Sequence, residues 1–302
     1  MSDDDGDDGA TGGDLTGERR PAGRYRLLER VGGAVWRALD ERTGREVAVR
    51  RPPLPYGVAG EERERVAHRL LHEARAAARV EHPSAVAVHD VVAEPESGES
   101  GGLPWIVTEW VPGESLRDRL ARGPLDAVEA ARVGLAVLGA LRAAHAVGIV
   151  HRDVRPANVL LGPSGRIALA GFGFEVPARG GEFEAPERGS GRGGGPASDL
   201  WSLGALLRAA VAPGDAGRLE PLLGRLLERD PQMRPGAEEA AAELEAVAGE
   251  RQAEPESRRA EPEPGPQPPP ESIPEPAPES TPERRRPAPV AALLEALGWA
   301  RG

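Results

Sequence analysis

The sequence predicts an α+β protein whose first part is built mainly of strands and whose second part is mostly helical. Residues 24–50 show strand-like apolar patterning around a Thr43-Gly44 turn, which predicts a small antiparallel sheet. Residues 125–147 form a long apolar stretch that Gly148 ends, and a helix this apolar belongs in a core. Strands followed by helices in this order are typical of the α+β class.

The strand-rich part is expected to contain one helix and two more strands. Residues 61–80 show helical periodicity, because apolar residues recur there on one face. Strands are expected near residues 85–92 and 105–109, and the loop between them is rich in Gly, Ser and Glu. This part is therefore expected to be a small sheet with a single helix.

The helical part is expected to hold two short strands and three helices after the long apolar helix. The strands are expected near residues 159–161 and 167–169. The helices are expected at about residues 198–212, 218–229 and 237–247.

Both ends of the chain differ in composition from its middle. Residues 1–22 are rich in Asp and Gly and lack large apolar groups, so we expect a disordered acidic tail. Residues 249–288 are rich in Pro and Glu, which predicts an extended linker. Residues 289–300 predict a short amphipathic helix, which either docks on a partner or folds back as a tail.

Composition and charge exclude several classes of function. The chain has no Cys, which excludes disulfides and thiolate metal sites, and it has no Lys, so every long cationic side chain is Arg. Its net charge of -11 argues against nucleic-acid binding. No apolar run reaches the roughly 20 residues of a membrane span, and the acidic N-terminus is unlike a signal peptide. We therefore expect a cytoplasmic protein.

The strongest motif is the eleven-residue segment HRDVRPANVLL, which begins at His151. It resembles the catalytic loop of serine/threonine protein kinases, where the family reads H-R-D-x-K-P-x-N. Asn158 is the only Asn in the chain and falls on the Asn of this pattern. The resemblance is closest to the actinobacterial-type branch of the family.

Other landmarks of the same family follow in family order between residues 24 and 247. They are the strand Val47–Arg50, Glu73, His82-Pro83, the segment 105–116, Ala185-Pro186-Glu187, Asp199–Gly204 and Arg234. The resemblance implies a two-lobed kinase-like domain over residues 23–248, with an N-lobe at 23–111 and a C-lobe at 112–248.

The resemblance also implies which residues form the site. It places Asp153, Arg155 and Asn158 in the catalytic loop, with Asn158 as a metal ligand. Asp153 either orients the hydroxyl nucleophile or is a loop carboxylate without a chemical role. The residues that the resemblance assigns to ATP are Gly32, Val35, Ala48, Arg50, Glu73, Glu109, Val111 and Leu160.

Three departures from the family pattern weaken the grip on phosphate and metal. The glycine-rich loop is short, because Gly32 and Val35 lie only three positions apart, which suits a plain hairpin. Arg50 replaces the phosphate-binding Lys, and its planar fork is not equivalent to an ammonium. Gly171 replaces the main magnesium-binding Asp, and this loss argues against Mg²⁺ binding. ATP binding is still expected.

A fourth departure concerns activation. Residues 174–184 contain no Ser, Thr or Tyr, so phosphorylation there cannot switch the domain on. Glu182 or Glu184 either pairs with Arg152 in place of a phosphate or is a solvated surface charge, which is the commoner outcome.

Contacts elsewhere in the domain are also expected from the resemblance. Glu73 is expected to pair with Arg50, Glu187 with Arg234, and Asp199 to cap the backbone of the catalytic loop.

Three functions remain open from the sequence. The first is a pseudokinase that works as a regulatory or scaffolding module with protein partners. The second is a weakly active serine/threonine protein kinase, because Asp153 and Asn158 are kept. The third is a small-molecule phosphotransferase, which the protein-kinase landmarks disfavour.

Overall fold

The computed structural model describes residues 20–32, 34–52, 60–93, 103–172, 181–189 and 194–249. All of these residues belong to one compact unit of the chain. Residues 1–19 of the expected tail 1–22, residues 250–288 of the expected linker 249–288 and the whole expected helix 289–300 lie outside the described residues. The end of the expected disordered tail is ordered, because Pro21–Gly23 form a 3-10 turn.

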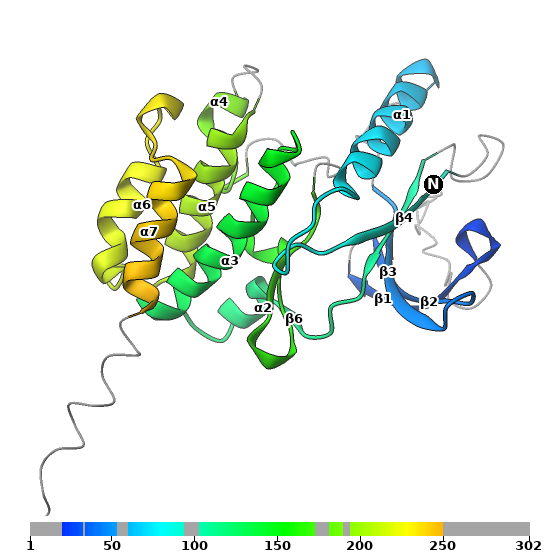
Figure 1. Ribbon diagram of the computed structural model, residues 1–302, viewed down its shortest axis with the longest axis horizontal. Coiled ribbons are helices and arrows are strands. Elements are labelled where there is room, and N and C mark those ends of the chain that lie inside the picture. Colours follow the sequence, from blue (N-terminus) through cyan, green and yellow to red (C-terminus); the bar gives the residue numbers. More distant parts are fainter. Residues whose placement is uncertain are drawn as a thin grey trace, which may run out of the picture. The chain divides into compact units, whose positions relative to one another are not determined.

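A five-stranded antiparallel sheet forms the N-lobe (Figure 1). Its strands run in the order β1-β2-β3-β5-β4. Their bounds are β1 (Tyr25–Gly32), β2 (Val35–Asp40), β3 (Arg45–Arg50), β4 (Val88–Val92) and β5 (Trp105–Glu109).

The two faces of this sheet carry different side chains, because successive residues of a strand point to opposite sides. One face holds a small core of its own, in which the rings of Trp36 and Trp105 meet edge to face at 5.6 Å. The other face carries Val35, Ala48 and Ile106, and Ile106 belongs to the larger core that α1 also joins. The ATP residues expected on β2 and β3 therefore share the face that is turned to the rest of the domain.

Helix α1 (Gly60–Ala77) is the one helix of the N-lobe. Its buried face is apolar and consists of Val66, Ala67, Leu70, Ala74 and Ala77. The helix ends three residues before the expected residue 80. Strand β4 also begins later than expected, because Ala85 forms only an isolated bridge to Leu169.

The segment after α1 attaches the N-lobe to the C-lobe through backbone hydrogen bonds. The amide of Val86 donates to the carbonyl of Leu169 at 2.9 Å, and the amide of Leu169 donates to the carbonyl of Ser84 at 2.8 Å. Leu169 ends β8 (Ile167–Leu169), which pairs with β7 (Val159–Leu161) and β6 (Glu114–Ser115) in a three-stranded sheet. Strand β8 is therefore held from both lobes.

The C-lobe is built around α3 (Ala127–Ala146), which packs against α5 and α7 (Figure 1). Its start is fixed by a capping box, in which Asp126 and Glu129 each accept from the other's backbone amide. The remaining helices are α2 (Leu116–Leu120), α4 (Pro186–Gly189), α5 (Pro196–Ala210), α6 (Glu220–Leu226) and α7 (Ala237–Ala248). Short 3-10 turns connect several of these elements.

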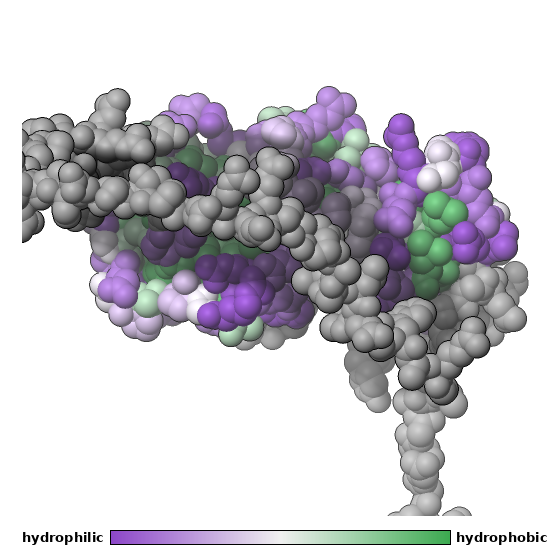
Figure 2. Space-filling model, turned by 90° about the horizontal axis from the view of Figure 1, so that it is seen from below, coloured by the Kyte–Doolittle hydropathy of each residue, from purple (hydrophilic) through white to green (hydrophobic). Residues whose placement is uncertain are grey.

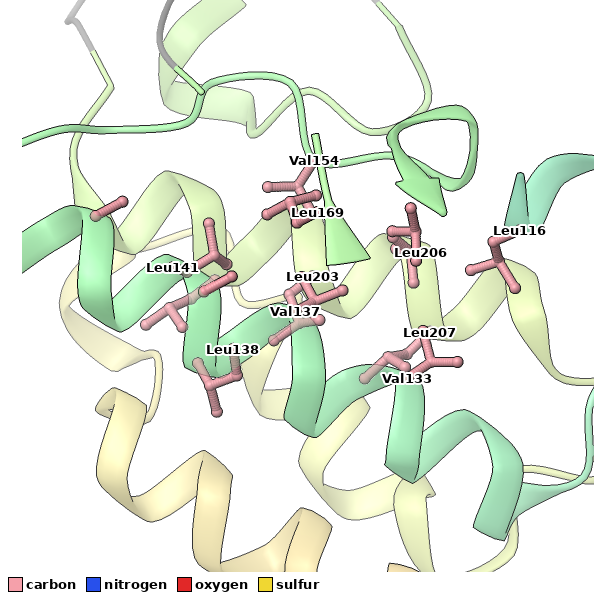
Figure 3. Packing of buried hydrophobic residues seen from close by; sticks show 14 of the residues in the cluster. Leu116, Val133, Val137, Leu138, Leu141, Val154, Leu169, Leu203, Leu206 and Leu207 are labelled. Carbon is pink, nitrogen blue, oxygen red and sulfur yellow. The ribbon is translucent and has the colours of Figure 1, made fainter. Parts of the chain in front are cut away.

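Leucine and valine side chains fill the space between α3 and α5, with Val154 and Leu169 beside them (Figure 3). Each fully buried side chain of this kind contributes about 1.5–3 kcal/mol. Val154 lies in the expected catalytic loop and is fully buried, so the core holds that loop in place.

The two-lobed kinase-like architecture expected from the sequence is confirmed. The antiparallel sheet with one helix and the helical C-lobe appear in the expected order. Helix α6 spans only Glu220–Leu226, which is shorter than the helix expected at residues 218–229. On the face shown in Figure 2, the described residues are mostly hydrophilic, with smaller hydrophobic groups between them. Across the described ranges, no helix is long and apolar enough to cross a membrane.

Candidate functional site

The expected catalytic loop lies between α3 and β7, and Asp199 of α5 holds its backbone. The carboxylate of Asp199 accepts from the amide of His151 at 2.8 Å and from the amide of Arg152 at 2.9 Å. Its Oδ2 also lies 2.7 Å from Nε2 of His145, at the end of α3. The expected capping role of Asp199 is therefore confirmed.

His151 is a fully buried support for the loop. Its Nδ1 accepts from the amide of Asp153 at 3.2 Å, so its proton resides on Nε2, which donates to the carbonyl of Ala170 at 2.9 Å. Burial lowers the pKa of His151, which keeps the ring neutral. The ring meets Phe172 edge to face at 4.9 Å, so His151 joins the loop to the residue after Gly171.

Asp153, Arg155 and Asn158 are brought together, as the resemblance implies. Nδ2 of Asn158 donates to the carbonyl of Asp153 at 2.8 Å and to its Oδ2 at 2.7 Å. Nε of Arg155 lies 3.2 Å from the same Oδ2. The carboxylate of Asp153 is therefore fixed, and Oδ1 of Asn158 is the oxygen that this side chain can offer to a ligand.

Arg152 links the catalytic loop to helix α1. Its NH1 lies 2.6 Å from Oε1 of Glu73, and its φ of +70° is unusual for a residue with a side chain. Arg188 of α4 donates to the carbonyl of Arg152. One residue thus connects α1, the loop and α4.

This ion pair differs from two candidate pairings. Glu73 was a candidate partner of Arg50, and Glu182 or Glu184 was a candidate partner of Arg152, with a solvated surface charge as the commoner outcome for these two glutamates. The pair observed joins Glu73 to Arg152 instead, because the long Arg152 side chain reaches across from the loop to α1.

The β1–β2 turn is a tight hairpin. Gly32 pairs with Val35 across the two strands, so only Gly33 and Ala34 connect them. This confirms the hairpin expected from the spacing of these residues. Arg50 ends β3 on the same face as Ala48 and lies opposite Val35.

Glu109 ends β5, and Val111 follows two residues later outside the sheet. The amide of Glu109 donates to the carbonyl of Ala87 at 2.8 Å. Its carboxylate binds both terminal nitrogens of Arg166, and this hydrogen bonding lowers the pKa of Glu109. Val111 is buried and packs in a small cluster with Leu160. Val111 and Leu160, two residues expected at the adenine site, therefore belong to one cluster.

Gly171 lies two residues after β8 and has no side chain that could offer an oxygen to a metal ion. Its φ is +92°, in the region that glycine favours, and the next residue, Phe172, is 1% exposed. Within the parts of the chain that are described, no group of three or more His, Cys, Asp or Glu residues could hold a metal ion.

Glu187 and Arg234 form the expected structural ion pair. NH1 and NH2 of Arg234 bind the two carboxylate oxygens at 2.7 and 2.8 Å, and Oγ of Ser198 donates to Glu187 at 2.6 Å. The Arg234 side chain is 1% exposed. These bonds lower the pKa of Glu187 to about 2.

Three residues of the site were missed from the sequence. His145 supports Asp199, Arg188 binds the carbonyl of Arg152, and Arg166 holds Glu109. The partners lie 54, 36 and 57 positions apart, so local patterns carry no signal for them. The position of His145 in the last turn of α3, close before the loop, was the one available hint.

Comparison with known proteins gives consistent matches. The protein kinase domain family matches residues 31–214. Serine/threonine-protein kinase PknA of Mycobacterium tuberculosis is 36% identical over 208 residues, which cover 63% of this chain and 47% of that protein. PknL of Mycobacterium bovis is 36% identical over 186 residues, covering 57% of this chain and 44% of PknL.

A third match has the same identity over a shorter range. The probable serine/threonine-protein kinase pknA2 of Bifidobacterium longum is 36% identical over 170 residues, which cover 53% of this chain and 22% of that protein. The chain therefore spans less than half the length of these relatives.

Proposed function

Since the chain belongs to the protein kinase family, we propose that its domain is a pseudokinase, a regulatory or scaffolding module that binds protein partners and does not transfer phosphate. The observation that carries this proposal is Gly171, which supplies no carboxylate where the family binds its metal. We place the domain at residues 23–248 and expect it to work in the cytoplasm.

The loss at Gly171 is large on the scale of catalysis. Removing one preorganised electrostatic group costs about 10²–10³ in rate. A backbone carbonyl is a poor replacement for a carboxylate at an octahedral magnesium site. Among the described residues of this motif, Asn158 offers one amide oxygen and Gly171 offers no side chain, so these two positions do not fit a magnesium ion in the manner of the family.

The Glu73–Arg152 pair supports a fixed scaffold. It joins α1 to the loop by groups that are charged without any modification. Because Arg remains protonated at all physiological pH values, the pair forms without a phosphorylation step. A domain whose surface stays the same is better suited to binding a protein partner than to working as a regulated enzyme.

The residues present fit a nucleotide base better than they fit the metal. Val35 and Ala48 share one face of the N-lobe sheet, and Val111 packs with Leu160 on the C-lobe side. Gly32, Arg50, Glu73 and Glu109 complete the proposed ATP site. Of these, Glu73 and Glu109 are bound by Arg152 and Arg166, so we assign them positioning roles.

A thermal-shift titration with ATP, with and without Mg²⁺, tests the nucleotide part of this proposal. We expect ATP to raise the unfolding midpoint equally with and without Mg²⁺. A shift that requires Mg²⁺ would contradict the proposal. If ATP gives no shift in either condition, the scaffold functions without nucleotide and the proposed ATP site is wrong.

A weakly active serine/threonine kinase is the second candidate. The fixed geometry of Asp153, Arg155 and Asn158 favours it, because a hydroxyl nucleophile needs a positioned carboxylate. Metal-dependent phosphate transfer that Asp153→Asn abolishes would establish this candidate over the first.

A further inference from the structure

Two histidines lie on the outer face of α1, one helical turn apart. His68 and His72 are both exposed, and their ring centroids are 4.8 Å apart. Residues at i and i+4 of a helix lie on the same face, one above the other. The buried residues of α1, such as Leu70 and Ala74, point to the core instead, so neither imidazole is needed for packing.

This arrangement has the chemistry of a metal chelate. Imidazole nitrogens bind Zn²⁺ at about 2.0–2.1 Å and are good ligands for Ni²⁺ and Cu²⁺ as well. Two His at i and i+4 on one helix face can bind a single ion without a change in the backbone. Rings whose centroids are 4.8 Å apart need only side-chain rotation to aim one nitrogen each at a shared point.

We propose that His68 and His72 form a two-point chelate for a divalent transition-metal ion, with Zn²⁺ as the reference ion. In the part of the chain that the structure describes, these residues do not belong to a group of three or more ligating side chains. Water, or a donor that is not among the described residues, would fill the remaining coordination positions.

The chelate would act on the helix that carries Glu73, the residue after His72. An ion bound to both imidazoles ties two successive turns of α1 together and stabilises the folded state by mass action. The site is separate from Asp153 and Asn158, so it stands independently of the proposed function.

Isothermal titration of the full chain with ZnCl₂ tests the proposal, using a purification tag without His. We expect one ion per chain in the wild type. His68→Ala or His72→Ala should each weaken binding by about tenfold or more, because one ligand alone loses the chelate. His89→Ala is the matched control, since His89 is exposed on β4 and should leave binding unchanged.

A second readout separates imidazole binding from binding to carboxylates. Zn²⁺ should shift the imidazole proton signals of two histidines in the wild type, and Mg²⁺ should shift none, because it prefers oxygen ligands. Both substitutions are at exposed helix positions, where Ala favours the helix, so the variants should fold. Absence of Zn²⁺ binding by the wild type, or Zn²⁺ binding by His68→Ala and His72→Ala as tight as that of the wild type, would overturn the proposal.

Discussion

Gly171 is the residue at which the site departs most from metal-dependent chemistry. Its φ of +92° suits glycine, but Asp and Asn tolerate positive φ better than other residues with side chains. The position can therefore be tested by returning a carboxylate to it.

Gly171→Asp should create magnesium-dependent nucleotide binding. The new carboxylate would add a hard oxygen ligand beside Asn158, and Mg²⁺ prefers such ligands. In a thermal-shift titration, ATP should then raise the midpoint further when Mg²⁺ is present. Gly171→Asn is the matched control, with the same size and backbone strain but no charge. An equal response of the two variants would show that the carboxylate is not the missing group.

Glu187→Gln should destabilise the domain by about 3–5 kcal/mol at pH 7, because it leaves the buried Arg234 charge without its carboxylate. Urea unfolding measures this change. Because the folded pKa of Glu187 is about 2 and its ordinary value is 4.5, its contribution is present above about pH 4.5. The contribution is lost as the pH falls from there toward 2. The difference between wild type and variant should therefore shrink at pH 3, and a constant difference would contradict the assignment.

At the scale of elements, the contact between α1 and the catalytic loop depends on Glu73 and Arg152. Their side chains are 24% and 41% exposed, so solvent weakens the pair. We expect the pair to matter more for the position and local opening of α1 than for global stability.

Glu73→Gln should speed hydrogen exchange in α1 while costing about 1 kcal/mol or less in global stability. Glu64→Gln, at an exposed position on the same helix, is the control and should leave exchange unchanged. Combining Arg152→Gln with Glu73→Gln should change the exchange rate of α1 little beyond the effect of Glu73→Gln alone, because both substitutions remove the same ion pair. Additive effects of the two substitutions would mean that the residues act separately.

The elements were predictable from the sequence where local patterns are strong. The long apolar helix and the short strands at residues 159–161 and 167–169 appear as expected. The late start of β4 was not predictable, because the bridge between Ala85 and Leu169 depends on a distant part of the chain. The exact end of α1 was not predictable either, because local sequence marks helix ends poorly.

The site was predictable where its residues belong to one sequence motif. Asp153, Arg155 and Asn158 lie within six positions and converge through local geometry. Arg152, the partner of Glu73, lies 79 positions away in the sequence. Whether Arg50 or Arg152 binds Glu73 depends on how the folded chain places them, which sequence spacing does not show. Arg50 was therefore the wrong partner for Glu73, although an Arg was correctly expected.

At the scale of the whole molecule, two lobes are joined through a shared core and through β8. The large core cluster includes residues of α1 as well as α3 and α5. A domain with such a continuous core can remain folded and present a constant surface whether or not it binds a nucleotide.

The central claim is that this intact frame does not transfer phosphate. Incubation of the full chain with γ-labelled ATP, Mg²⁺ or Mn²⁺ and a generic protein substrate tests it most directly, with Asp153→Asn measured in parallel. We predict that label transfer by the wild type equals that of Asp153→Asn and of a blank without protein. Transfer by the wild type that Asp153→Asn abolishes would contradict the claim and identify an active kinase.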